Sequence, residues 1–463
     1  MRFVLILCKL NPRNSGVFCM SLLITNAKVI NEGQIQALDV YIDNGRIESI
    51  GADLSSTPAD RVIDAQGLYL MPGMIDDQVH FREPGLTHKG NIASESRAAI
   101  AGGITSYMEM PNTNPITDSA EAVEEKYQRA ATKSLANFAF YLGATNTNLE
   151  AIKSLDPNLA SGVKVFMGAS TGNMLVNDPK VLEGIFEHCP ILIATHCEDT
   201  PMIEANAQKF RERYGDDIPI ECHPEIRSRE ACLKSSSLAV SLAKTHGANL
   251  HVLHLTTADE LKLFQAGDVR HKKITAEVCV HHLFFSSDDY ARLGAQIKCN
   301  PAIKLPSDRA ALQQAVLDDV IDIIATDHAP HTWEEKQGTY FKSPAGLPLV
   351  QHALLSLLEH HYNGSFSLEK IVQKTSHAVA QRYQVKDRGF IREGYWADLV
   401  LVDLHKPTTV SKDNILYHCG WSPFQGTTFH SSIVSTIVNG HVVFDQGALQ
   451  DAPLGQRLQF DRK

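Results

Sequence analysis

The sequence predicts an α/β protein, a (β/α)8 TIM-like barrel with a small β-sandwich domain formed by both ends of the chain. Three observations predict this fold. Eight short apolar runs alternate with helical stretches in the middle of the chain, strand-rich segments flank them on both sides, and 463 residues exceed one typical domain. We expect the barrel to span residues 73–385 and the two parts of the sandwich to span 20–72 and 386–463.

The first 19 residues fit neither domain. Their apolar stretch, Phe3–Leu7, is shorter than the ~7–15 residues of a signal-peptide core, and no clean cleavage site follows it. Met20 then opens a good strand pattern. We expect Met20 to be the natural start and residues 1–19 to be an extension ahead of it, with a targeting segment as the alternative.

Both flanking segments alternate short β-rich runs with turn residues. Runs such as LLITNAKVI and ALDVYIDNGRIESIG precede the barrel, and GYWADLVLVD and SSIVSTIVNGHVVFDQG follow it. Each segment contains an Asn-Gly hairpin signal, at Asn44-Gly45 and at Asn439-Gly440. Because neither segment alone has enough strands to bury a core, we expect the two to pair into one β-sandwich.

The middle of the chain carries eight runs of nearly continuous apolar character, which is typical of parallel strands buried on both faces. The runs are GMIDDQVH (73–80), ITSYMEM (104–110), FAFYLG (138–143), GVKVFM (162–167), ILIATH (191–196), LHVLHL (250–255), ITAEVCV (274–280) and IDIIAT (321–326). Helix candidates lie between them, among them Ser94–Ala101, Ser119–Thr132 and Ser235–Thr245. A doubly wound open sheet is the alternative, but no G-x-G-x-x-G turn follows the first run.

The composition excludes several classes of protein. The net charge of −10 argues against nucleic acid as a partner. Nine scattered cysteines without a C-x-x-C pair argue against a disulfide framework and fit the reducing cytoplasm. No apolar run approaches the ~18 residues of a membrane span. We therefore expect a cytoplasmic protein that acts on a small molecule, with no nucleic-acid or membrane partner.

Reactive side chains fall at the carboxyl ends of the predicted strands, where the active sites of such barrels lie. His80, Asn112, Lys164, His196, His254 and Asp327 each end, follow or lie within a different run. Two more histidines, His281 and His282, follow the seventh run. One histidine at such a place is usually a packed core residue, but agreement among several strands predicts a common site.

Four of these side chains suit a metal ion. His80, His196, His254 and Asp327 offer imidazole and carboxylate ligands of the kind that Zn²⁺ prefers. An ammonium at Lys164 would repel a cation, so we expect this lysine to react with CO2, giving a carbamate whose two oxygens bridge two metal ions. The alternative is an ion pair between Lys164 and a carboxylate such as Asp327.

The motifs resemble those of the amidohydrolase superfamily, in the dihydroorotase branch that is related to hydantoinases, dihydropyrimidinases and allantoinases. The strings that carry the resemblance are PGMIDDQVHFREPG (72–85), MPNTNP (110–115), GVKVFMG (162–168), THCE (195–198), HVLHLTT (251–257), EVCVHHL (277–283), KCNPAIK (298–304) and ATDHAPH (325–331). The resemblance implies a carbamylated Lys164 between two metals, with His196 and His254 on one and His80 and Asp327 on the other.

One position departs from the family. Its usual His-x-His pattern reads Gln78-Val79-His80 here, and a carboxamide oxygen is a weaker ligand than imidazole. We therefore expect one or two zinc ions per chain, with the metal beside His80 and Asp327 bound more loosely.

The resemblance also implies a substrate and a mechanism. The positions of Arg82, Asn112 and His331 would bind a substrate carboxylate, and Asn300 would contact the ring. Independently of the resemblance, we expect Ala345 and Gly346, in the loop 332–348, to approach the ring through backbone groups. The implied reaction is the reversible cyclisation of N-carbamoyl-L-aspartate to L-dihydroorotate in de novo pyrimidine (UMP) biosynthesis, with Asp327 as general acid and base.

Several alternatives stay open. A hydantoinase, dihydropyrimidinase or allantoinase would share the fold and metals, and a catalytically silent scaffold paralogue has only Gln78 in its favour. The loop 332–348 is long enough to close over a substrate. His281 and His282 either support the metal site or pack, Cys197 and Cys279 are expected to be buried, and the resemblance suggests a homodimer.

Overall fold

The computed structural model describes residues 21–168 and 174–462, so the prediction for residues 1–19 lies outside the described residues. All eight apolar runs contain a strand, and the third run is divided between two. These strands are β6 (Met74–Val79), β7 (Ile104–Glu109), β8 (Asn137–Phe140), β9 (Leu142–Gly143), β10 (Val163–Phe166), β11 (Ile193–His196), β12 (Leu250–Val252), β13 (Ile274–Cys279) and β14 (Ile323–Ala325). Neighbouring strands pair in parallel within a sheet of β6, β7 and β8 and a sheet of β9 to β14.

Two seams join these sheets. At the first, the backbone N–H of Tyr141 donates to Glu109 O of β7 at 3.0 Å, and the next residue, Leu142, donates to Gly162 O at 3.1 Å. At the second, Val79 and His328 form an isolated parallel bridge, and His80 N donates to His328 O at 2.7 Å. The parallel strands therefore follow one another in chain order, and the segment after β14 returns to β6.

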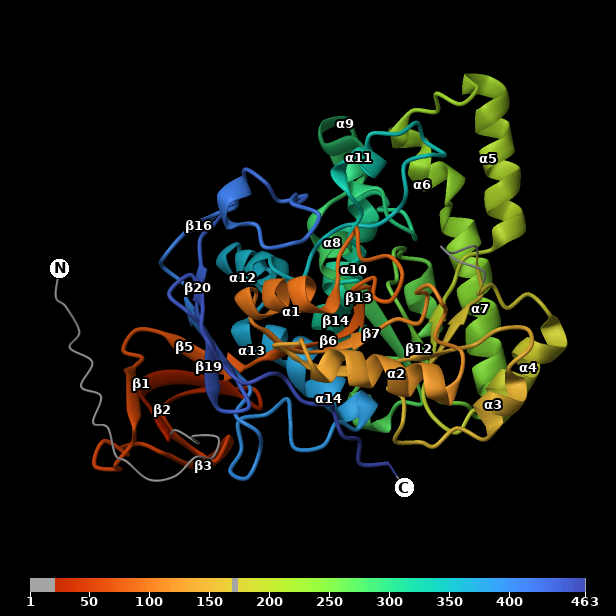
Figure 1. Ribbon diagram of the computed structural model, residues 1–463. Coiled ribbons are helices and arrows are strands. Elements are labelled where there is room, and N and C mark those ends of the chain that lie inside the picture. The colour runs from red at the N-terminus through yellow and green to blue at the C-terminus, as the bar shows by residue number, and fades with distance from the viewer. Residues whose placement is uncertain (1–20, 169–173, 463) are drawn as a thin grey trace.

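Helices alternate with the strands and cover them (Figure 1). They are α1 (Ile92–Ala101), α2 (Ala120–Ala131), α3 (Leu149–Lys153), α4 (Pro179–His188), α5 (Thr200–Tyr214), α6 (His223–Ile226), α7 (Arg229–His246), α8 (Val280–Phe284), α9 (Tyr290–Leu293), α10 (Pro306–Leu317), α11 (Trp333–Lys336), α12 (Ala353–Tyr362), α13 (Leu368–Val372) and α14 (Ala378–Tyr383). The helices predicted from Ser94 and Ser119 lie at α1 and α2, and the Ser119 side chain caps α2 by accepting from Ala122 N. The third predicted helix begins earlier than expected, because Ser228 caps α7 in the same way.

Strands from both flanking segments share one hydrogen-bonded sheet, in which β5 pairs antiparallel with β15. Its nine strands are β1 (Leu22–Asn31), β2 (Gln34–Asp43), β3 (Arg46–Gly51), β4 (Arg61–Asp64), β5 (Tyr69–Pro72), β15 (Leu399–Asp403), β18 (Ser432–Val438), β19 (His441–Asp445) and β20 (Ala448–Leu449). A separate ribbon pairs β16 (Thr408–Thr409) with β17 (Thr428–Phe429). In Figure 1 the red strands β1 to β3 lie on the same side of the molecule as the blue strands β19 and β20.

The two Asn-Gly signals form two-residue hairpin loops. Asn44 and Gly45 have φ of 51° and 78° between β2 and β3, and Asn439 and Gly440 have φ of 50° and 80° between β18 and β19. Positive φ at both central residues is the geometry that favours Asn-Gly, because Asn tolerates it and Gly has no Cβ.

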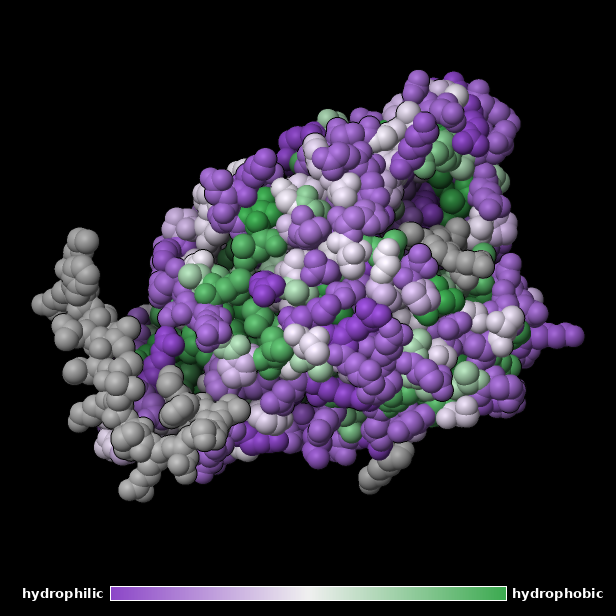
Figure 2. All heavy atoms as spheres, viewed as in Figure 1, coloured by the Kyte–Doolittle hydropathy of each residue, from purple (hydrophilic) through white to green (hydrophobic). Residues whose placement is uncertain are grey.

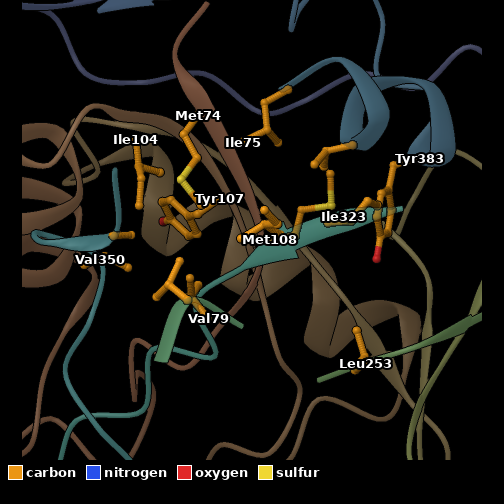
Figure 3. Packing of buried hydrophobic residues seen from close by; sticks show 14 of the residues in the cluster. Met74, Ile75, Val79, Ile104, Tyr107, Met108, Leu253, Ile323, Val350 and Tyr383 are labelled. Carbon is orange, nitrogen blue, oxygen red and sulfur yellow. The ribbon is translucent and has the colours of Figure 1, made fainter. Parts of the chain in front are cut away.

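The main apolar core lies among the parallel strands and the helices around them. Figure 3 shows Met74 of β6 beside Ile104 and Tyr107 of β7. Hydrophilic residues cover much of the face in Figure 2, including the region over α2 and α5. Among the described residues, no helix is long and apolar enough to cross a membrane.

Candidate metal centre and substrate pocket

A cavity lies at the carboxyl ends of the parallel strands, where the sequence predicts the site. Residues of β6, β10, β11 and the loops after β7, β12 and β14 line it. The lining residues are Gln78, His80, Arg82, Asn112, Lys164, Phe166, His196, His254, Asn300, Asp327, Ala329, Ala345 and Gly346. The structure thus brings together every predicted site residue except His331. Phe166 and Ala329 were missed. Phe166 lies two residues after Lys164 in β10 and so shares its face of the strand.

His80 and Asp327 face each other with a geometry that suits a cation. His80 Nδ1 donates to Asn112 Oδ1 at 2.8 Å, which leaves Nε2 toward Asp327 Oδ1 at 3.1 Å. Burial lowers the pKa of His80, which favours its neutral imidazole. With its proton on Nδ1, this ring would present the Nε2 lone pair to a metal ion beside a carboxylate oxygen of Asp327.

His196 and His254 form a second pair of this kind. His196 Nε2 donates to Glu198 Oε2 at 3.0 Å, so its Nδ1 lone pair points toward His254 Nε2, 3.1 Å away. Burial lowers the pKa of both histidines, and that of His254 falls well below its usual range. Two neutral imidazoles that converge in this way are suited to sharing one metal ion.

Glu198 is a functional residue to which sequence reasoning gave no role. Its carboxylate is fully buried and forms an ion pair with Arg227. Burial works against ionisation, but Arg227 and His196 outweigh it and lower the pKa of Glu198 to about 2. A carboxylate behind a ligating histidine fixes the tautomer and orientation of the ring.

Lys164 is buried in the cavity wall without an ion-pair partner among the described residues, so the alternative of a pair with Asp327 is not observed. Its Nζ lies 4.7 Å from the centre of the Phe166 ring. Burial lowers the pKa of Lys164 to about 8, although Asp327 and Glu277 oppose the shift. A substantial neutral fraction of this amine near pH 7 is what reaction with CO2 requires.

Arg82 supplies positive charge to the same cavity. Its Nε donates to Pro330 O at 3.0 Å, and its Nη2 lies 3.1 Å from His331 Nε2. Burial lowers the pKa of Arg82 to about 10, which leaves the guanidinium charged at neutral pH. The structure therefore places a cationic fork beside the predicted metal ligands.

His331 lies behind Arg82 rather than in the cavity wall. Its Nε2 is 3.1 Å from Ala345 O, and its Nδ1 is 3.1 Å from Lys89 Nζ. These contacts position Arg82 and the loop that carries Ala345, so direct contact between His331 and a substrate stays a prediction.

Backbone conformation marks the site as well. Arg82, His254 and Asp327 have φ of 70°, 41° and 50°, in the left-handed region that residues other than glycine rarely adopt. Such strain concentrates at functional sites, where the surrounding structure holds it in place. No sequence signal marks these positions.

Two buried groups of potential ligands lie close to the cavity. Asp77, His251 and Glu277 form one; burial opposes charge on His251, but the two carboxylates outweigh it and raise its pKa to about 9. Cys279, His281 and His282 form the other, with one ligand atom of each within 4.8 Å of the others. His281 and His282 do not line the cavity, and Cys197 and Cys279 are buried as expected.

Residues 69–443 match the amidohydrolase family, and the chain belongs to this family. Members of the family generally depend on metal ions, which agrees with the paired histidines and Asp327.

The chain is similar in sequence to several dihydroorotases. It is 32% identical over 423 residues to the dihydroorotase of Halobacterium salinarum, covering 90% of this chain and 95% of that protein. It is 32% identical over 447 residues to the dihydroorotase of Bacillus subtilis, covering 93% and 100%. An allantoinase of Rubrobacter xylanophilus is 31% identical over 453 residues, covering 95% and 98%. The predicted resemblance is confirmed.

A solved structure shows the same fold. L-Hydantoinase (dihydropyrimidinase) from Arthrobacter aurescens has a TM-score of 0.89 and 27% identity, covering 95% of this chain and 100% of that one. The α/β fold class is therefore confirmed, and this family likeness extends over nearly the whole length of both chains.

Proposed function

We propose that this chain is a dihydroorotase, which interconverts N-carbamoyl-L-aspartate and L-dihydroorotate plus water in de novo pyrimidine (UMP) biosynthesis. The observation that carries the proposal is the position of Arg82, a charged guanidinium in the wall of the cavity that the predicted metal ligands also line. A substrate with a carboxylate suits this fork, and relatives that are dihydroorotases support the choice.

We propose one closed (β/α)8 barrel for the parallel strands, supported by the two seams that join their sheets. The nine-stranded sheet would curl into the predicted β-sandwich. Leu22 and Val40 from its first strands share an apolar cluster with Leu399 and Ile437 from its last, as packing of the sheet against itself requires.

The proposed metal ligands are the nitrogen and oxygen atoms of side chains that line the cavity. His196 and His254 would hold one Zn²⁺, His80 and Asp327 a second, and a carbamate on Lys164 would bridge them. In forming it, the Lys164 Nζ lone pair bonds to the carbon of CO2 and the nitrogen loses a proton. Zn²⁺ bound there lowers the pKa of water and polarises a carbonyl oxygen.

The chain's own residues then perform the remaining tasks. Arg82 holds the substrate carboxylate, with Asn300 beside the ring, and Asn112 keeps His80 in the tautomer that presents Nε2. In hydrolysis, Asp327 takes a proton from the attacking water while the water oxygen bonds to the ring carbonyl carbon. Asp327 then gives that proton to the ring nitrogen as the carbon–nitrogen bond breaks. Cyclisation is the reverse and expels water.

Allantoinase or hydantoinase activity is the second candidate, supported by the allantoinase and L-hydantoinase relatives. A catalytically silent scaffold protein has less support. Lys164 and the imidazoles of His196 and His254 are buried polar groups, and folding alone does not need them there. We further propose a cytoplasmic location, in keeping with the free cysteines of the described residues. A homodimer is proposed only from the family resemblance.

Comparing rates on three substrates tests the proposal. The purified protein should hydrolyse dihydroorotate far faster than hydantoin or allantoin. Arg82→Gln should raise KM for dihydroorotate by roughly 10- to 150-fold, since a charge-assisted pair contributes about 1.5–3 kcal/mol. Zinc content measured on the same variant controls for a damaged metal site. Faster turnover of hydantoin or allantoin by the wild-type protein would contradict the assignment.

A further inference from the structure

A buried lysine, Lys336, contacts the segment that carries Ala345 and Gly346 into the cavity wall. Lys336 is the last residue of α11 and is only 1% exposed. Its Nζ donates to Pro344 O at 2.8 Å, to Gly346 O at 3.0 Å and to Lys298 O at 3.3 Å. The ammonium therefore uses all three of its N–H donors on backbone carbonyls.

These carbonyls belong to two segments that form one side of the cavity. Ala345 and Gly346 line the cavity from the first segment, and Asn300 lines it from the second. The carbonyl of Lys298, two residues before Asn300, also accepts from Gly346 N at 2.8 Å. The Lys336 ammonium therefore joins the two segments at the point where they already meet.

A second buried ammonium holds the middle of the same loop. Lys298 is 6% exposed, and its Nζ donates to Ser343 O at 2.7 Å and to Tyr340 O. The Ser343 Oγ in turn donates to Lys336 O at 3.2 Å. The span 340–346 is thus attached along its length to buried amines rather than to solvent.

Keeping these charges buried costs free energy. Neither Lys336 nor Lys298 forms an ion pair with another of the described residues, and burial lowers the pKa of both amines. An apolar side chain of similar volume would avoid that cost if packing were the only requirement. The arrangement points instead to a need for donors that fix the carbonyls of the loop.

We propose that Lys336 is a positioning residue: its three hydrogen bonds hold the 344–346 segment and Asn300 together as one preorganised wall of the cavity. The loop 332–348 would then be a fixed wall rather than a lid that closes over the substrate. This inference rests on the proposed function, because that wall faces the ring of the substrate. Ordering the wall before the substrate arrives reduces the entropy lost on binding.

Substrate affinity tests the proposal. Lys336→Met keeps a linear side chain without donors, so KM for dihydroorotate should rise by about tenfold or more while kcat changes less than about threefold. Zinc content should stay the same. Lys342→Met makes the same replacement at an exposed position of the same loop and should leave KM unchanged. An unaltered KM in Lys336→Met, or a fall in kcat alone, would contradict the proposal.

A second control separates positioning from stability. Lys374 is also buried, where its Nζ donates to Ile321 O at 2.7 Å and pairs with Asp319 at 2.8 Å, and both partners lie outside the cavity lining. Lys374→Met should lower the melting temperature without raising KM. If it raises KM as much as Lys336→Met does, general destabilisation explains both results and the assignment is wrong.

Chemical rescue tests whether the ammonium itself matters. Lys336→Ala leaves room for a small amine, and propylammonium should lower the raised KM because its nitrogen can donate to the same carbonyls. Tetramethylammonium has the charge but no N–H donor, so it should have no effect. Equal effects of the two cations would exclude the hydrogen-bonding role.

Hydrogen exchange measures the wall without any substrate. Peptides that cover 340–347 should exchange at least about tenfold faster in Lys336→Met than in the wild-type protein, because the wall opens more often without its donors. Lys374→Met should leave these peptides as they are. Equal exchange in Lys336→Met and the wild type would overturn the proposal.

These readouts are separate from the proposed function. Faster exchange in Lys336→Met, combined with a wild-type protein that does not turn over dihydroorotate, would leave the positioning role standing and defeat the proposed function. Turnover of dihydroorotate with the same KM in both proteins would do the reverse.

Discussion

At the scale of single residues, the site is built from neutral bases held in one orientation by groups behind them. Asn112 fixes His80 and Glu198 fixes His196, so each ring presents a lone pair toward its partner. Burial keeps these imidazoles neutral, which is the state that binds a metal. The supporting amide and carboxylate therefore matter as much as the rings they hold.

In the proposed mechanism Asp327 has two roles, because it faces His80 and also transfers the proton. Asp327→Ala should lower kcat by about 10²–10⁴-fold or more while the melting temperature stays close to that of the wild type. Asp451→Ala, at an exposed position, is the control and should leave kcat unchanged. Near-normal turnover by the Asp327 variant would remove it from the mechanism.

The pKa of Lys164 gives the site a predictable pH dependence. Because this pKa is lowered to about 8, the reactive neutral amine falls about tenfold per pH unit below 8 and levels off above it. After removal of metal and CO2, uptake of carbon-13-labelled CO2 at constant dissolved CO2 should follow that curve, measured by NMR. Lys164→Ala should give no signal, and uptake that does not change between about pH 6 and 9 would exclude carbamate formation at this amine.

At the scale of elements, the strands were the most predictable feature, because apolar runs of five or six residues between helical stretches have few other interpretations. The ligands at strand ends followed from that order, since parallel strands bring their carboxyl ends to one side. The third run forms two short strands, because β8 pairs with β7 whereas β9 pairs with β10, and no local pattern reveals where the partner changes. The ion pair of Glu198 with Arg227 joins separate segments, so no local pattern in the sequence indicates it.

A substitution of Gly346 tests how tightly the loop that carries it packs against the cavity wall. Gly346 has φ of 143°, and a Cβ there would lie 2.4 Å from Ala329 O and 2.9 Å from His331 Cδ2. Gly346→Ala should raise KM by about tenfold and destabilise the protein by ~1–3 kcal/mol, with zinc content unchanged. Gly364→Ala is the matched control, since it has φ of 76° with open space around it, and it should leave KM unaltered.

At the scale of the whole molecule, a buried polar network ties the parallel strands to the nine-stranded sheet. Arg388 forms an ion pair with Asp398 and donates to Asn439 Oδ1 at 2.8 Å. Asn137 of β8 donates to both Asp398 oxygens at 3.2 Å, and Asn439 N donates to Asp398 Oδ1 at 2.8 Å. The Asp398 carboxylate thus joins the parallel strand β8, the β18–β19 hairpin and the segment before β15.

Removing the Asp398 carboxylate should weaken the attachment of the nine-stranded sheet to the parallel strands. Asp398→Ala leaves the Arg388 guanidinium, only 3% exposed, without its counter-charge, so we expect a loss of roughly 3–5 kcal/mol in the free energy of unfolding. Asp398→Asn, which keeps an acceptor oxygen, should lose less, and Glu125→Ala, which breaks an exposed pair with Arg129, should cost no more than about 1 kcal/mol. Chemical denaturation followed by fluorescence and circular dichroism measures all three. Because the network spans both regions, the wild-type protein should unfold in one coincident transition. Two separate transitions would show that the nine-stranded sheet and the parallel strands fold independently.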